Sequence, residues 1–221
     1  MKKKILPALF MAGMLLLQGC GGSSATESTI EISSKGVVTQ TTIETLDAEY
    51  YDSDELKSYV QDQVDEYNEE STAAGTVKLK KFKYSASEGT VTLVLKFSDA
   101  DTYADFEWLT FFVGTVDEAK AAGYEFSVTL IPYEDAPDAD ETLQESGDAV
   151  QGAASSDAQV FDGTQGMGLS GEENVVILQE SYQVAVPGDV LYVTDGACSV
   201  VSDDTVAVDA SQNDLIYIIY E

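Results

Sequence analysis

The groups with which this chain could perform chemistry are mainly carboxylates. Of its 221 residues, 40 are Asp or Glu and 11 are cations, all of them lysine, while histidine and arginine are absent. Without histidine there is no Ser-His-Asp or Cys-His catalysis and no imidazole metal ligand. Without arginine there is no bidentate clamp for phosphate or carboxylate. The chemistry that remains is that of carboxylates, tyrosines, lysines and hydroxyls.

Two carboxylates held about 5 to 9.5 Å apart across a sugar can hydrolyse a glycosidic bond. With 40 acidic residues many such pairs are conceivable, and nothing in the sequence singles one out. We therefore assign no catalytic residue and expect a protein that is not an enzyme. A carboxylate-based enzyme, such as a glycoside hydrolase, is the first alternative.

A calcium-dependent adhesin or sensor is the second alternative, because residues 121–221 hold 20 acidic residues and no cation. Calcium needs six to eight converging oxygen ligands. Two groups of acids could supply some of them: Asp138, Asp140 and Glu141, or Asp203, Asp204, Asp209 and Asp214. Neither group has the spacing of an EF-hand, and runs of like charge usually stay solvated. We expect acidic surface here and predict no metal site and no cofactor.

The remaining candidates for a functional site are a glycine motif and a cysteine. Gly166, Gly168 and Gly171 match GxGxxG, but they precede expected strands, whereas a nucleotide site needs a turn from a strand into a helix. Cys198 lies between turn residues and an apolar run, with no base or cation nearby in the sequence to lower its pKa. We expect Cys198 to be a small buried side chain instead of a nucleophile.

The first residues of the chain form an export signal. Lys2, Lys3 and Lys4 precede a short apolar run, which ends at Leu17-Gln18-Gly19-Cys20 and is followed by small polar residues. This ending resembles the lipobox of bacterial lipoproteins. The resemblance implies cleavage before Cys20 and attachment of diacylglycerol to its sulfur. Two or more acyl chains suffice for stable anchoring. A plain cleaved signal or an N-terminal membrane helix is the alternative.

The net charge of −29 limits the partners of the chain. Such a field repels nucleic-acid phosphates and anionic lipid headgroups, so we expect no nucleic-acid partner and no electrostatic membrane binding. The lipid on Cys20 would then anchor the protein to the outer face of the cell membrane. Four lysines, Lys78, Lys80, Lys81 and Lys83, form the one cationic cluster after the signal, and we interpret them as a solvated strand face.

The pattern of apolar residues predicts an α+β fold. Strands are expected at 29–33 and 37–46 around the turn Ser34-Lys35-Gly36, and at 76–86 and 90–98 around Glu88-Gly89. The doublet Lys80-Lys81 breaks the alternation of its strand, which indicates a bulge or a sheet edge. The second of these hairpins has a single apolar face, made of Val91, Leu93, Leu95 and Phe97.

Helices are expected after the first hairpin and after the second. One begins at the N-cap Asp52 with Glu55 as its capping-box partner, and directs Leu56, Tyr59, Val60, Val64 and Tyr67 towards the core. A short helix should cover 100–109, with Tyr103 and Phe106 inward. Another should begin at a capping box of Thr115 and Glu118, with Gly123 at its end.

These elements divide the chain into a signal peptide (1–19), a flexible tether (20–28), an α+β region with antiparallel strands and two or three helices (29–133), an acidic linker or loop (134–172) and a small, mostly β region (173–221). The last region is too short to be stable alone, so we expect it to pack on 29–133. The acidic segment is longer than most loops of a compact domain.

Taken together, the lipobox signal, the small-residue tether and the segments at 33–36, 47–68 and 112–124 resemble the uncharacterised small lipoproteins of low-GC Gram-positive bacteria. The resemblance implies an extracytoplasmic location and transfers no activity. We expect a non-catalytic module that binds an unknown protein or small molecule, because binding needs only a shaped surface whereas catalysis generally recruits groups with tunable pKa.

Overall fold

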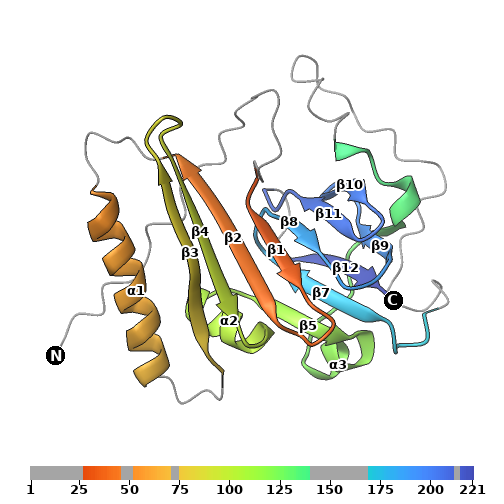
Figure 1. Ribbon diagram of the computed structural model, residues 1–221. Helices are drawn as coiled ribbons and strands as arrows, with labels where there is room; N and C mark the ends of the chain where they lie inside the picture. Colours follow the sequence, from red (N-terminus) through yellow and green to blue (C-terminus); the bar gives the residue numbers. More distant parts are fainter. Residues whose placement is uncertain (1–26, 46–51, 71–74, 140–168, 212–214) are drawn as a thin grey trace.

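The computed structural model describes residues 27–45, 52–70, 75–139, 169–211 and 215–221 (Figure 1). Within these ranges the helices are α1 (Ser53–Glu70), α2 (Ala100–Glu107), α3 (Val116–Ala121) and the 3-10 helix η1 (Tyr133–Asp135). All of them precede the run of strands that ends the chain, so the predicted α+β class is confirmed. The predicted signal peptide, most of the tether with Cys20, and much of the acidic segment lie outside the described residues.

The described strands form two sheets. Sheet A has seven strands in the order β10 (Cys198–Ser202), β11 (Thr205–Val208), β8 (Gln183–Ala185), β1 (Thr29–Ile32), β2 (Val38–Thr45), β4 (Thr90–Phe97) and β3 (Val77–Ser85). Sheet B has five, in the order β5 (Phe111–Thr115), β7 (Asn174–Leu178), β12 (Ile216–Tyr220), β9 (Val190–Thr194) and β6 (Leu130–Pro132). Neighbouring strands are antiparallel except β1 and β8, which are parallel.

Strands from the last fifty residues enter both sheets. In sheet A, β8 pairs with β1, and in sheet B, β7 pairs with β5. The C-terminal strands thus form one end of sheet A, and in sheet B they form the centre between β5 and β6. The cost of closing such long loops is offset only when these non-local pairings form.

Both predicted hairpin turns are present. Gly36 and Gly89 have φ of 74° and 62°, a left-handed conformation that glycine adopts without strain. In β4 the apolar residues Val91, Leu93, Leu95 and Phe97 are buried, as their alternation predicts. The register between β3 and β4 shifts between Leu79 and Lys81, and β3 is the last strand of sheet A. The Lys80-Lys81 doublet thus marks both a bulge and an edge.

Helix α1 begins as predicted, because Asp52 Oδ1 accepts hydrogen bonds from the backbone N–H groups of Asp54 and Glu55 at 2.8 and 3.2 Å. Val60 and Val64 are buried, and Leu56 and Tyr67 pack against them. Tyr59 is 41% exposed, so its predicted core position is wrong. At 100° per residue it lies about a quarter turn from the centre of the stripe that the other four residues form.

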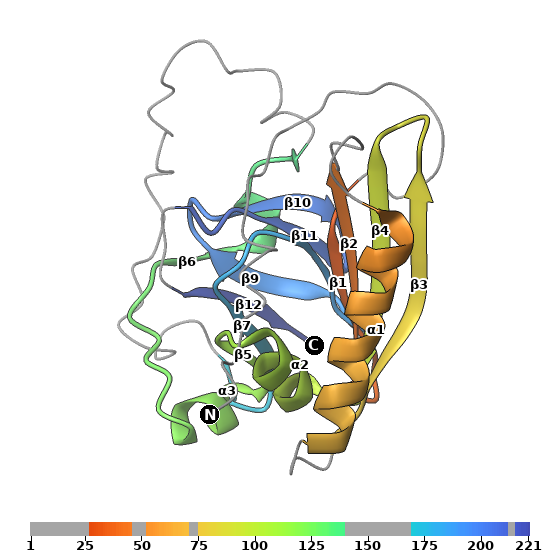
Figure 2. The ribbon, with the colours of Figure 1, turned by 90° about the vertical axis from the view of Figure 1, so that its left-hand side faces the viewer.

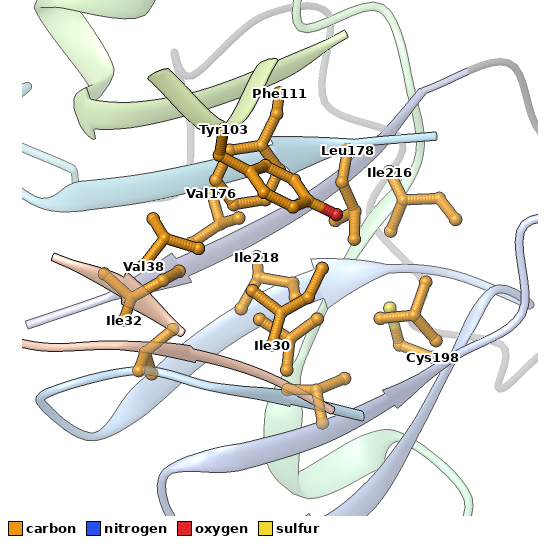
Figure 3. Close-up of a cluster of buried hydrophobic side chains, with 14 of the residues drawn as sticks. Ile30, Ile32, Val38, Tyr103, Phe111, Val176, Leu178, Cys198, Ile216 and Ile218 are labelled. Atoms are coloured by element: carbon orange, nitrogen blue, oxygen red, sulfur yellow. The ribbon is translucent and has the colours of Figure 1, made fainter. Parts of the chain in front are cut away.

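One face of sheet A is covered by two different layers (Figures 1 and 2). Helices α1 and α2 lie over β2, β4 and β3, while sheet B lies over β1 and the strands beyond it. A single apolar cluster runs through both layers. In Figure 3, Ile30 and Ile32 of β1 point towards Val176 and Ile218 of sheet B, and Tyr103 of α2 lies beside them. The opposite face of sheet A is free of described helices and strands.

Sheet B is buried on both faces, which explains the composition of its central strands. Its second face packs against α3 and the following segment, in a smaller cluster that includes Val116, Phe126 and Tyr217. Each residue of β12 is buried, and so is each residue of β7 after Asn174. Strands that are covered on both sides lose the alternation of apolar and polar residues.

The outer strands of the sheets are protected in different ways. β10 is covered by the chain itself, because the Val200 N–H donates to the carbonyl of Pro137 at 2.8 Å and Asp138 bridges to Val200. β6 is only three residues long and ends in Pro132. β3 carries lysines and a bulge. Among the described residues, no helix is long and apolar enough to cross a membrane.

Candidate functional site

A polar network interrupts the apolar core at the junction between the two layers that cover sheet A. Its members come from β2, from α2 and from the segment between β7 and β8: Gln40, Thr42, Tyr103, Glu107, Glu180 and Tyr182. Carboxylates, phenols, an amide and a hydroxyl are thus in mutual contact. No lysine takes part in this network.

Tyr103 is held in place by the N-cap of α2 and by the packing of its ring against other aromatic side chains. Asp99 is the N-cap, and its Oδ1 accepts hydrogen bonds from the N–H and the hydroxyl of Thr102 at 2.7 and 2.6 Å. The ring of Tyr103 packs edge-on against Phe97 and Phe111, with centroids 5.0 and 4.7 Å apart. Its side chain is fully buried. The phenol oxygen therefore occupies a fixed point inside the molecule.

Gln40 connects the two phenols. It faces the core from the centre of β2 and is 5% exposed. Its Nε2 donates to the hydroxyl of Tyr182 at 3.0 Å and to that of Tyr103 at 3.5 Å. The Tyr103 hydroxyl in turn donates to Glu180 Oε2 at 3.3 Å. Among the described residues, no buried side-chain polar atom lacks a hydrogen-bond partner, so the network is satisfied.

The pKa values of both carboxylates of the network are raised. Burial raises the pKa of Glu107 to about 7, the negative charge of Glu180 adds to this effect, and a hydrogen bond with Gln40 opposes it. Burial also raises the pKa of Glu180, and the hydrogen bond from Tyr103 lowers it. Both side chains are only half-buried, so they remain in contact with solvent. With a pKa of about 7, Glu107 is present in both protonation states near neutral pH.

The phenols stay protonated throughout the physiological range. Burial and the charges of Glu180 and Glu107 raise the pKa of Tyr182 to about 12, against the hydrogen bonds of Gln40 and Thr42. The pKa of Tyr103 is raised by burial and by the charges of Tyr182, Glu180 and Glu107. Both hydroxyls therefore serve as neutral hydrogen-bond donors beside two carboxylates.

The only tryptophan of the chain follows Glu107 directly. Trp108 is the C-cap of α2, its N–H donates to the Ala104 carbonyl, and its φ and ψ of 59° and 43° are left-handed. Among the described residues it is the one non-glycine with positive φ. Its side chain is 68% exposed. The left-handed backbone costs stability and the exposed indole adds little to it, and such features concentrate at functional sites.

The arrangement supports two kinds of chemistry. A carboxyl group with a pKa near 7, beside a second carboxylate and neutral phenols, can donate or accept a proton at neutral pH. An exposed indole next to carboxylates can bind a ligand by stacking and hydrogen bonding. The structure thus singles out an interacting pair, Glu107 and Glu180, that the sequence left among 40 equivalent acids.

The other candidate residues are placed apart from this network. Cys198 is buried, and burial raises the pKa of its thiol to about 12, so the prediction of an inert core side chain is confirmed. Asp204 accepts hydrogen bonds from Ser202 and Thr205, and Asp209 from the N–H of Ser211. In the described ranges, no three His, Cys, Asp or Glu side chains gather as metal ligands. Asp140, Glu141, Gly166, Gly168 and Asp214 lie outside those ranges.

Sequence reasoning identified Tyr103 only as a core residue and missed the rest of the network. Glu180 and Tyr103 are 77 positions apart, and Gln40 and Tyr182 are 142 apart. The available signal was local: a glutamate beside the only tryptophan at the end of a helix. Comparisons of the chain with protein-family models, with curated proteins and with solved structures gave no match.

Proposed function

We propose that this protein is an extracytoplasmic binding module, held at the cell membrane by lipid on Cys20, and that its ligand binds where α2 ends. The observation that carries the ligand site is the position of Trp108. An exposed indole in a left-handed conformation lies directly after Glu107, which is coupled to Glu180. The left-handed conformation ends α2, but a helix end does not require the largest side chain at this position, so a role in binding accounts for an exposed tryptophan there.

The anchor rests on the sequence of the first twenty residues. Replacing Cys20 with Ser should prevent lipidation and normal processing. The expected result is a protein that leaves the membrane fraction and no longer incorporates a labelled fatty acid. A Cys20→Ser variant that stays membrane-bound and is processed at the same position would contradict the proposal.

The ligand site can be tested with the tryptophan itself. We would present the full chain with a panel of glycans and peptides and follow the emission of Trp108 and the melting temperature. A ligand that stacks on the indole should shift the emission, and Trp108→Ala should weaken binding at least about tenfold. The matched control is Tyr59→Ala, because Tyr59 is also exposed but lies on α1. Equal losses in both variants would argue against a site at Trp108.

A carboxylate-based enzyme is the second candidate, favoured by the proton that Glu107 exchanges near pH 7 beside Glu180. The same panel should then be examined for product release. Turnover that is abolished by Glu107→Gln or Glu180→Gln, with binding retained, would establish the enzyme and overturn the non-catalytic module. A large rise in melting temperature with calcium alone would favour calcium dependence over both.

A further inference from the structure

The outer face of sheet A segregates the positive charge of an acidic protein. Five lysines belong to β3 and β4: Lys78, Lys80, Lys81, Lys83 and Lys96, and all five are exposed. Neither strand contains an acidic residue. Among the described residues, none of these five lysines forms an ion pair. In a chain of net charge −29, such a cluster is not expected from the average composition.

The bulge in β3 gathers these lysines on one face. Before it, Lys78 pairs with Lys96, and after it, Lys81 pairs with Val94 and Lys83 with Thr92. Paired residues of neighbouring strands project to the same side of a sheet. Without the register shift, Lys81 and Lys83 would lie on the core side with Leu79. The bulge therefore directs Lys78, Lys81, Lys83 and Lys96 outward together.

The surface around these lysines offers hydroxyl groups. The register places Thr39, Thr41 and Thr45 of β2, and Thr90 and Thr92 of β4, on the same side as Lys96. Helices α1 and α2 lie on the opposite side of these strands, as Figure 2 shows. We name the surface of these four outward lysines and five threonines the lysine face. It presents ammonium and hydroxyl donors and, across β2, β3 and β4, no carboxylate.

We infer that the lysine face binds a linear polyanion that carries phosphate groups. Residues on one side of a strand repeat about every 6.6 Å, so Lys78, Lys81 and Lys83 form a row of charges along β3. A chain of phosphates can lie along such a row and contact each ammonium in turn. Lysine binds phosphate as a point charge without the fixed fork of arginine, which suits a repeating ligand of adjustable spacing.

The negative charge of the remaining surface favours a thin ligand over a broad one. Screening limits electrostatic effects to about 8 to 10 Å at physiological salt. A thin polymer on β3 stays within that distance of the lysines, whereas a membrane or an acidic protein would also approach the carboxylates of the rest of the chain. A broad acidic partner is therefore repelled where a thin one is not.

The experiment measures binding of inorganic polyphosphate to the full chain by titration calorimetry in mild detergent. The test variant is Lys81→Gln with Lys83→Gln. The control is Lys35→Gln with Lys57→Gln, which removes the same charge from a turn and from α1. We expect the test variant to bind about tenfold more weakly and the control to bind like the wild type. Raising the salt from 50 to 200 mM should weaken wild-type binding by roughly thirtyfold.

Several outcomes would overturn the inference. They are no binding of polyphosphate, equal losses in both variants, or tighter lysine-dependent binding of phosphatidylglycerol vesicles or polyglutamate. Self-association of the wild type that the test variant abolishes would identify a second copy of the chain as the occupant. If the test variant aggregates while its binding of polyphosphate is unchanged, the lysines only protect the edge of the sheet. Circular dichroism of each variant verifies that it is folded.

Discussion

The hydroxyl of Tyr103, at the end of a fully buried side chain, donates a hydrogen bond to Glu180, a half-buried carboxylate 77 residues further along the chain. This bond connects α2 to the segment after β7. It therefore links the helical layer over sheet A to the sheet B layer. Replacing either residue should affect both the stability of the fold and the protonation of the site.

Tyr103→Phe should remove this link without leaving a large cavity. We expect a loss of about 1 kcal/mol in the free energy of unfolding, because one net hydrogen bond is lost and the ring is kept. The pKa of Glu180 should rise further, since the Tyr103 bond lowers it. Urea denaturation and carboxyl-carbon NMR titration measure the two effects. Tyr59→Phe, on the exposed side of α1, serves as the control and should change neither.

Glu107→Gln should alter how stability depends on pH. The pKa of Glu107 is raised from 4.5 to about 7 in the folded protein, so the folded state binds the proton more tightly than the unfolded state. Its favourable contribution is complete below pH 4.5 and is lost as the pH rises through 7. The Gln variant, which cannot ionise, should exceed the wild type by about 3 kcal/mol at pH 8 and match it near pH 4. Thermal unfolding across this range measures the difference.

The exposed Glu66 of α1 provides the control for that experiment, because Glu66→Gln removes the same charge away from the site. A variant at Glu107 whose advantage is the same at pH 4 and pH 8 would contradict the assigned pKa. An equal pH-dependent gain in Glu66→Gln would attribute the effect to net charge instead.

Trp108→Gly should make the protein more stable. Glycine adopts the left-handed conformation without the cost of about 1 kcal/mol or more that another residue incurs, and the exposed indole has little packing to lose. Trp108→Ala keeps the strained conformation and should give no such gain. Chemical denaturation followed by circular dichroism compares the two. A Gly variant less stable than the Ala variant would mean that the backbone at this position is not strained.

Cys198 should be unreactive in the folded protein. Its thiol is buried, with a pKa raised to about 12, so almost no thiolate is present at pH 8. In a Cys20→Ser background, Ellman's reagent should label no cysteine under native conditions and one cysteine in 6 M guanidinium. Prompt labelling of the native protein would contradict the buried position.

Local patterns predicted the local parts of the fold. The stripe of Val60 and Val64, the turn at Gly89 and the capping box of Thr115 and Glu118 each depend on residues a few positions apart, and each is present. Tyr59 shows the limit of this reasoning, because spacing alone places a residue near a stripe without fixing how wide the buried stripe is.

The sheet pairings and the candidate site required tertiary information. The parallel pairing of β1 with β8 and the insertion of β7 beside β5 join segments that are far apart in the sequence. Glu107 and Glu180 become a pair only through these pairings. The tryptophan beside Glu107 is a local signal, but no local feature distinguishes Glu180 among the 40 acids or predicts that the two are brought together in a partly buried environment.

The contrast between the two ends of sheet A bears on aggregation. At β10, the free backbone groups are partly occupied by the Pro137 segment, so a foreign strand finds fewer partners there. At the other end, β3 of a second copy could add to β3 of the first only by placing its lysines against Lys78, Lys81 and Lys83. The like charges would repel each other. An unprotected edge strand can pair with strands of other copies and seed cross-β fibrils. The Pro137 segment at β10 and the lysines at β3 therefore hinder the addition of foreign strands at both edges of sheet A.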